Sequence, residues 1–121
     1  MFFLLQIANK EKILANEFAY AIYDGFPVSE GHMLVVPRRE VPQIFDLNKD
    51  EYIGCFELVA EVKRYLQKKF NPDGFNIGIN VNESTGQTVF IGHIHIIPRY
   101  KGDVGNPRGG IRNIIPDKGD Y

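Results

Sequence analysis

One long stretch of helical periodicity, near residues 49–70, constrains the fold of this chain more than any other feature. Asn48 and Glu51 have the spacing of a capping box, in which an N-cap side chain and a glutamate satisfy backbone N–H groups at a helix start. Apolar side chains then recur every three or four residues, which predicts one buried face of a helix. The predicted face comprises Tyr52, Phe56, Val59, Val62, Leu66 and Phe70, with Cys55 beside it expected to be a packed thiol and not a nucleophile.

The other apolar segments are short and are bounded by glycine, proline or asparagine, as is typical of strands joined by turns. Residues 17–24 and 32–37 have this character, and residues 75–82 and 88–97 also alternate in polarity. Strands around one long helix predict an α+β domain, with an antiparallel sheet of about five strands and the helix packed on one face. A chain of 121 residues, 44% of them hydrophobic, can bury the core of one such domain.

We expect residues 1–121 to form this single domain, with residues 100–121 as an extended C-terminal arm. The arm is rich in glycine, so no regular element is predicted in it. We expect three isoleucines to pack the arm against the rest of the chain: Ile111, Ile114 and Ile115.

Charge and cysteine content narrow the possible partners. Fourteen basic and fifteen acidic side chains give a formal net charge of -1, so we expect no nucleic-acid or membrane partner. No apolar run approaches the length of a membrane span. The single cysteine cannot form an internal disulfide, and the first residues lack the basic region and length of a signal peptide, so we expect a cytoplasmic protein.

Two histidines, His93 and His95, lie one residue apart in an isoleucine-rich run that Pro98 ends. In a strand this spacing places both imidazoles on one face. The alternative is a strand with two unrelated polar residues, but histidine clusters commonly mark chemistry or metal binding. His32 begins another predicted strand, and Asp24 ends the one before it.

Asparagines alternate with apolar residues along the predicted strand 75–82. A row of asparagines on one strand face favours contact with a ligand over a bare solvent surface. The loop Glu83–Gly86 leads from this strand into the histidine strand, so we expect the two strands to be hairpin neighbours. Asn80 would then lie close to the histidines.

The chemistry of this set suits a phosphate. A neutral imidazole can attack a phosphate ester without a separate base, and a second histidine can donate a hydrogen bond to the leaving oxygen. Backbone N–H groups around Gly86, Gln87 and Thr88 could stabilise the negative charge, together with the Thr88 hydroxyl. A zinc or iron site built from His32, His93 and His95 is the least favoured alternative, because no carboxylate is evident as a partner.

These motifs resemble the histidine triad (HIT) superfamily of nucleotide hydrolases and transferases. The resemblance covers about residues 17–99 and rests on three motifs: Gly86-Gln-Thr-Val89 followed by His93-Ile-His95-Ile-Ile-Pro98, Gly31-His32-Met-Leu-Val-Val-Pro37, and Asp24 eight residues before His32. The segment from Asn106-Pro-Arg-Gly-Gly-Ile-Arg112 to Pro116 also resembles a bacterial subgroup described as diadenosine polyphosphate hydrolase-like.

The resemblance implies a role for each residue. His93 corresponds to the nucleophile that forms a nucleotidyl-histidine intermediate, His95 to the histidine that contacts the scissile phosphate and leaving group. His32 would support the site, and Asp24 would hold the ribose hydroxyls. Ile22 corresponds to an apolar wall of the base pocket, and polar contacts to the ribose and α-phosphate correspond to Asn80, Gln87 and Thr88.

One departure from the family pattern concerns the first of three alternating histidines, because Ile91 stands at that position. By strand parity residue 91 faces the site, so a hydrogen-bonding group is lost there. Such a group would help to fix the orientation or tautomer of its neighbours, and its loss is expected to slow the reaction about 10- to 100-fold.

We therefore expect a hydrolase or transferase that cleaves a dinucleoside polyphosphate or a nucleoside phosphoramidate. The alternative is a nucleotide-binding protein of low turnover, which the change at Ile91 makes plausible. No cofactor and no metal are expected, and the zinc-binding cysteines of some relatives are absent. The resemblance also implies a homodimer with sheets continuing across the interface, and leaves open whether Arg108 and Arg112 reach the substrate or only pack the arm.

Overall fold

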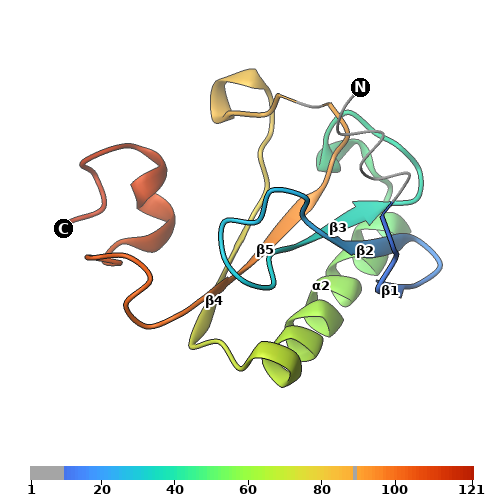
Figure 1. The fold of residues 1–121 in the computed structure, drawn as a ribbon. Coiled ribbons are helices and arrows are strands. Elements are labelled where there is room, and N and C mark those ends of the chain that lie inside the picture. The colour runs from blue at the N-terminus through green and yellow to red at the C-terminus, as the bar shows by residue number, and fades with distance from the viewer. Residues whose placement is uncertain (1–9, 89) are drawn as a thin grey trace.

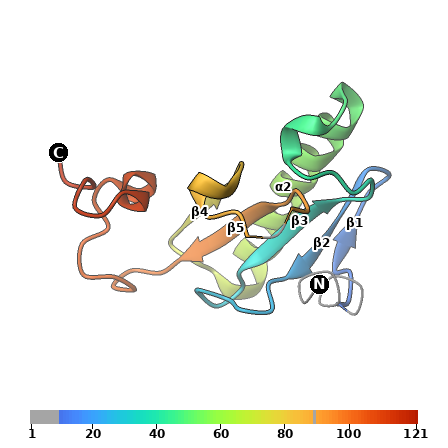
Figure 2. The ribbon, with the colours of Figure 1, turned by 90° about the horizontal axis from the view of Figure 1, so that it is seen from above.

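The computed structural model describes residues 10–88 and 90–121 and contains one antiparallel sheet with a long helix across one face (Figures 1 and 2). The strand order is β1-β2-β3-β5-β4. The strands are β1 Leu14–Ala15, β2 Ala19–Tyr23, β3 Met33–Pro37, β4 Gly74–Gly78 and β5 Ile94–Arg99, and the helices are α2 Lys49–Phe70 and the 3-10 turns η1 Ile44–Asp46, η2 Glu83–Thr85 and η3 Gly110–Ile114. The predicted five-stranded antiparallel sheet with one long helix is confirmed.

Helix α2 has the predicted bounds and the predicted capping box. The Asn48 side chain accepts from the Glu51 backbone N–H, and the Glu51 carboxylate accepts from the Asn48 N–H, each at 2.9 Å. Arg39 donates to both Glu51 oxygens at 2.8 and 2.9 Å and holds the pKa of that carboxyl well below its usual range. Asn71, in the left-handed conformation with φ 50°, ends the helix.

The main core lies between α2 and the sheet. The buried stripe of the helix consists of Cys55, Leu58, Val59, Val62 and Leu66. The prediction was wrong for Phe56, which is exposed because it lies about 100° around the helix from its neighbour Cys55. Cys55 is a buried free thiol whose pKa burial raises to about 11, which agrees with its predicted packing role.

A second apolar cluster lies on the opposite face of the sheet. It consists of Ile22, Leu34, Val36 and Ile91, with Tyr20 packed against it. Alternation along β2 explains the division, since Ala19 and Ala21 belong to the core under the helix, whereas Tyr20 and Ile22 face away from it.

Strands β4 and β5 are antiparallel neighbours, as predicted, and Gly78 is opposite His95. Both are shorter than predicted. Strand β4 stops at Gly78, so Asn80 lies beyond it, and β5 starts only at Ile94. The backbone at Gly92 instead donates to the Val41 carbonyl at 2.7 Å, and the chain passes so close to Gln43 and Ile44 that a Cβ at residue 92 would clash. The Val89 part of the predicted strand lies outside the described residues.

The C-terminal arm, residues 100–121, leaves the end of β5 and lies beyond the β4 edge of the sheet (Figures 1 and 2). Part of it forms the 3-10 turn η3, where no regular element was predicted. The expected packing of its isoleucines was wrong, because Ile111, Ile114 and Ile115 are 54%, 66% and 59% exposed. Their exposure follows from the path of the arm, which leads away from the apolar core.

Within the part of the chain that the structure describes, no helix combines the length and apolar character needed to cross a bilayer.

Candidate active site

The three histidines meet on the sheet face opposite α2. His95 lies in β5 next to Leu34 of β3, and His93 immediately precedes β5. His32 immediately precedes β3 and is buried. The ring centroids of His32 and His95 are 5.2 Å apart, and those of His93 and His95 are 4.9 Å apart. The structure thus brings together the histidines that the sequence singles out.

Hydrogen bonds fix the tautomers of His32 and His95. The backbone N–H of Val28 donates to His32 Nδ1 at 3.2 Å, so a neutral His32 carries its proton on Nε2. His32 Nε2 lies 3.0 Å from His95 Nδ1 and 3.4 Å from an Asp24 carboxylate oxygen. The Nε2–H of His32 therefore donates to His95 Nδ1, and the proton of a neutral His95 is on its own Nε2. His95 is thus a hydrogen-bond donor through Nε2.

His93 has the opposite arrangement. Its Nδ1 lies 2.7 Å from the Ile91 carbonyl oxygen, which can only accept, so Nδ1 carries the proton. The lone pair of a neutral His93 is then on Nε2, as a nucleophile requires. The side chain of Ile91 is only 8% exposed and packs in the second apolar cluster. For His93, the backbone of residue 91 supplies the tautomer control that the missing histidine was expected to supply.

Burial keeps these imidazoles uncharged at neutral pH. It lowers the pKa of His32 and of His93, although the nearby Asp24 carboxylate opposes both changes. Burial, followed by the proximity of His93 and His32, lowers the pKa of His95 to about 4. Neutral rings are what the tautomer assignments require, and a neutral His93 retains its nucleophilic lone pair.

The loop before β5 is held by Gln87, whose side chain is buried. The Asn82 N–H donates to its carbonyl oxygen at 2.8 Å, and its amide nitrogen donates to the Pro42 carbonyl at 2.7 Å. These bonds give Gln87 a positioning role in the loop. Gly86 ends η2 in the left-handed conformation with φ 96°, and Thr88 is exposed.

The remaining predicted contact residues lie on neighbouring elements. Asn80 is half-buried just beyond β4, and Ile22 is buried in the second apolar cluster. Asp24 follows β2, and its second carboxylate oxygen accepts from the Phe26 N–H at 2.8 Å. Sequence reasoning missed the Val28 N–H and the Ile91 carbonyl, because backbone groups have no signature in residue type.

Asp24, His32 and His95 form a group with the spacing of metal ligands, because one ligand atom from each lies within 4.8 Å of the others. The sequence argument that no carboxylate accompanies the histidines was therefore wrong, although the cluster contains Asp24 in place of His93. A metal bound through His32 Nε2 and His95 Nδ1 would need lone pairs on both nitrogens and would break the hydrogen bond between them. The observed bonding suits a proton-donor pair better than a pair of ligands.

Comparison with known proteins agrees with this geometry. Residues 6–102 match the HIT domain family. A bis(5'-adenosyl)-triphosphatase of Dictyostelium discoideum is 37% identical over 100 residues, which cover 83% of this chain and 67% of that protein. An asymmetrical bis(5'-nucleosyl)-tetraphosphatase of Schizosaccharomyces pombe is 43% identical over 77 residues, which cover 64% of this chain and 42% of that protein.

Among solved structures, a HIT family protein from Bacillus anthracis matches with a TM-score of 0.76 and 35% identity, over 84% of this chain and 74% of that chain. The chain thus spans 67% and 42% of the lengths of the two curated relatives.

Proposed function

This chain belongs to the HIT family, and on that premise we propose that it cleaves a nucleoside phosphate derivative through a covalent intermediate on His93. The names of two relatives, a triphosphatase and a tetraphosphatase acting on dinucleoside polyphosphates, support the reaction class. The observation that carries the proposal is the set of hydrogen-bond distances around the three histidines, which favours opposite tautomers with a lone pair on His93 Nε2 and a proton on His95 Nε2.

In the first step His93 Nε2 forms a bond to the α-phosphorus. The bond from phosphorus to the leaving oxygen breaks, its electron pair stays on that oxygen, and the His95 Nε2–H donates a hydrogen bond to it. His93 becomes positively charged, which strengthens the bond from its Nδ1–H to the Ile91 carbonyl.

In the second step water attacks the α-phosphorus, the bond to His93 breaks, and the electron pair returns to Nε2. The nucleoside monophosphate leaves, and a proton passes to solvent. Another nucleophile in place of water would give a transfer reaction. A neutral His95 can stabilise a polyphosphate oxygen by a hydrogen bond, whereas an amine must gain a proton to leave, so we favour a dinucleoside polyphosphate over a phosphoramidate.

The alternative of a nucleotide-binding protein with low turnover is not favoured. It depends on the loss of a histidine at Ile91, but the bond that sets the His93 tautomer uses the backbone carbonyl of that residue. The family resemblance implies that Asp24 binds the ribose, that Ile22 contacts the base, and that Asn80, Gln87 and Thr88 contact the ribose and α-phosphate. The backbone N–H groups around Gly86 would stabilise the phosphoryl charge.

A homodimer is part of this proposal. Strand β4 is at the edge of the sheet, and its Ile77 is 41% exposed. A second copy pairing along β4 would satisfy the backbone groups of that edge and cover Ile77. A cytoplasmic location is supported by the single, buried, free cysteine.

The test is release of AMP from diadenosine tetraphosphate and from an adenosine phosphoramidate. The His93→Ala variant should lose turnover, whereas a Phe56→Ala control on the exposed side of α2 should retain it. Acid-free quenching and mass spectrometry should show one AMP bound to the wild type and none bound to the His93→Ala variant. Turnover that survives in the variant would contradict the mechanism.

A further inference from the structure

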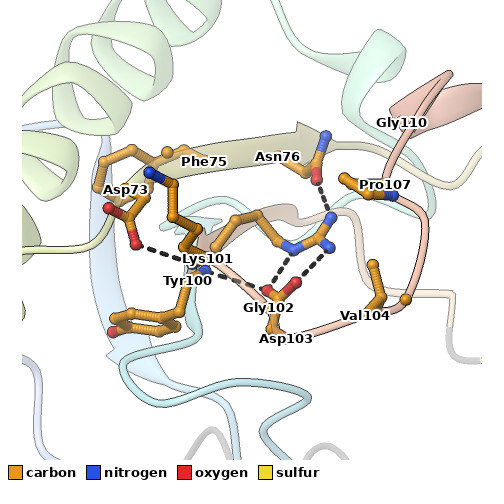
Figure 3. Close-up of a pocket in the computed structure, with 13 residues that line it drawn as sticks. Asp73, Phe75, Asn76, Tyr100, Lys101, Gly102, Asp103, Val104, Pro107 and Gly110 are labelled. Atoms are coloured by element: carbon orange, nitrogen blue, oxygen red, sulfur yellow. Dashed lines mark hydrogen bonds and ion pairs between the residues drawn. The ribbon is translucent and has the colours of Figure 1, made fainter.

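The root of the C-terminal arm is fixed to the sheet. Arg99, on the same face of β5 as His95, donates to both oxygens of Asp103 at 2.8 and 2.9 Å and to Asn76 of β4 at 2.6 Å. The backbone N–H of Lys101 donates to Asp73 at 2.8 Å (Figure 3). The residues that form these bonds line a cavity of about 520 Å³ between β4 and the arm. The arm therefore leaves the body in a set direction on the histidine face.

The tip of the arm is folded on itself. Arg112 donates to the Lys118 carbonyl at 3.1 Å, and Asn113 donates to the Arg108 carbonyl at 3.3 Å. The guanidinium groups of Arg108 and Arg112 lie 5.1 and 5.0 Å from the centre of the Tyr121 ring, so one aromatic ring holds two cations. The exposed isoleucines of the arm nevertheless have no covering within the described chain. A preformed tip with an open apolar surface is suited to packing on another molecule.

Symmetry identifies where that surface would lie in the proposed dimer. Strand β4 runs from Gly74, opposite Arg99 at the arm end, to Gly78, opposite His95. A two-fold axis that pairs β4 with β4 of a second copy reverses the strand direction and keeps the same face of both sheets upward. The arm end of one copy then lies at the histidine end of the other.

The distances permit a contact. In a continuous sheet the two β5 strands would be separated by three strand spacings, or about 14 Å. Ten residues separate Tyr100 from Gly110, where η3 begins, and could span up to about 33 Å. The arm also lies beyond the β4 edge, on the side where a second copy would pair (Figures 1 and 2).

Charge complementarity agrees with this placement. The nine residues assigned to the site include Asp24 and three neutral histidines but no lysine or arginine, although a polyphosphate is highly anionic. The arm tip provides paired arginines. Arg108 is 3.4 Å from Asp120, and both side chains are largely exposed, so phosphate oxygens could readily replace this ion pair.

We propose that the C-terminal arm of one copy completes the active site of a second copy, packing through its isoleucines and presenting Arg108 and Arg112 to the distal phosphates of the substrate. This inference rests on the proposed function and dimer. It assigns Tyr121 as a positioning residue that holds the two guanidinium groups together.

Substrate length provides the first test. The Arg108→Ala/Arg112→Ala variant should lose about 10- to 100-fold in kcat/KM on diadenosine tetraphosphate, as expected for charge-assisted contacts. It should change little on an adenosine phosphoramidate, which has no distal phosphates. Tyr121→Ala should give part of the same loss, whereas Tyr121→Phe, which keeps the ring, should not. Equal losses on both substrates would contradict a contact with distal phosphates.

Subunit complementation distinguishes action on the second copy from action within one chain. Heterodimers of His93→Ala and Arg108→Ala/Arg112→Ala subunits, isolated with two affinity tags, would contain one site with intact His93 and an intact arm from the other copy. These heterodimers should recover about half of the wild-type activity per dimer, because one of two equivalent sites is restored. Activity no greater than that of the arginine-variant homodimer would overturn the proposal.

Sedimentation measures the oligomeric state, and so tests the docking of the arm independently of the proposed activity. Ile114→Asp should shift the protein from dimer towards monomer, whereas Ile53→Asp on the exposed side of α2 should not. An inactive wild type that still shows this shift would refute the proposed function but support docking of the arm. A wild type that is monomeric, or a dimer unaffected by Ile114→Asp, would refute the docking whatever the activity.

Discussion

Replacing Ile91 by histidine, which would restore the three-histidine pattern that the sequence resemblance implies, is expected to lower stability without a large gain in turnover. The Ile91 side chain is 8% exposed and packs with Ile22, Leu34 and Val36. These apolar neighbours offer no hydrogen-bond partner from their side chains, and a buried imidazole nitrogen without a partner costs about 1–3 kcal/mol. At about 3–5 °C per kcal/mol for a chain of this size, the melting temperature should fall by roughly 3–15 °C.

The Ile91→His substitution should change kcat much less than it changes stability, because the backbone carbonyl of residue 91 is kept. We expect kcat to stay within about threefold of the wild type, equivalent to less than about 0.7 kcal/mol in the activation free energy. Thermal melting and AMP release from diadenosine tetraphosphate, with the assay run below the melting transition, measure the two quantities. Ile91→Val is the matched control, and should cost about 0.5–1.5 kcal/mol of stability with the same rate.

A tenfold or larger increase in kcat for Ile91→His would refute this reasoning, because it would show that the wild type lacks a catalytic group that the carbonyl does not replace. The original sequence-based expectation of a 10- to 100-fold impairment would then be correct.

Three further predictions concern the hydrogen-bonded pair His32 and His95 and the loop that Gln87 holds. Burial holds the His95 pKa at about 4, below its unfolded value, so kcat/KM should show no loss from His95 protonation between pH 7 and about 5. Because the folded pKa is the lower one, the contribution of His95 to stability is full above about pH 6.5 and falls progressively towards pH 4, as urea unfolding would measure. His32→Ala should lower kcat about 10- to 100-fold by removing the donor to His95 Nδ1, with partial recovery in His32→Gln, whose amide can donate; equal rates for the wild type and both variants would contradict this positioning role. Gln87→Leu should cost about 1–3 kcal/mol of stability by leaving the Pro42 carbonyl and the Asn82 N–H without this partner, and should weaken nucleotide binding, as measured by urea unfolding and calorimetric titration; unchanged stability would show that these bonds do not hold the loop.

Local sequence signals predicted the regular parts of the fold. The capping box at Asn48 and Glu51 involves residues only three positions apart in the sequence, and the start of α2 followed from it. Strand ends were harder to predict, because they depend on distant contacts. The bond from the Gly92 N–H to Val41 and the close approach to Gln43 prevent β5 from beginning before Ile94, and neither contact has a local pattern.

The C-terminal arm shows a different limit of predicting structure from the sequence of one chain. Its isoleucines were expected to pack because a single chain usually buries such residues, yet in this chain they remain exposed. The apolar pattern of a segment identifies a surface that needs a partner but does not identify the molecule that provides it. A prediction from one chain would fail at these residues if, as we propose, their partner is a second copy.

The candidate site residues were selected in the sequence by side-chain chemistry, but the roles proposed for them depend on two backbone groups. The Val28 N–H requires His32 to donate, which leaves the proton of His95 on its Nε2, and the Ile91 carbonyl places the lone pair of His93 on Nε2. Any residue other than proline at position 28 offers the same N–H, and any residue at position 91 offers the same carbonyl, so this control tolerates side-chain change if the backbone path is kept. Isoleucine at residue 91 is compatible with catalysis on this argument because the neighbouring apolar cluster holds the backbone there. The substitutions most damaging to the site should therefore be those that shift this backbone.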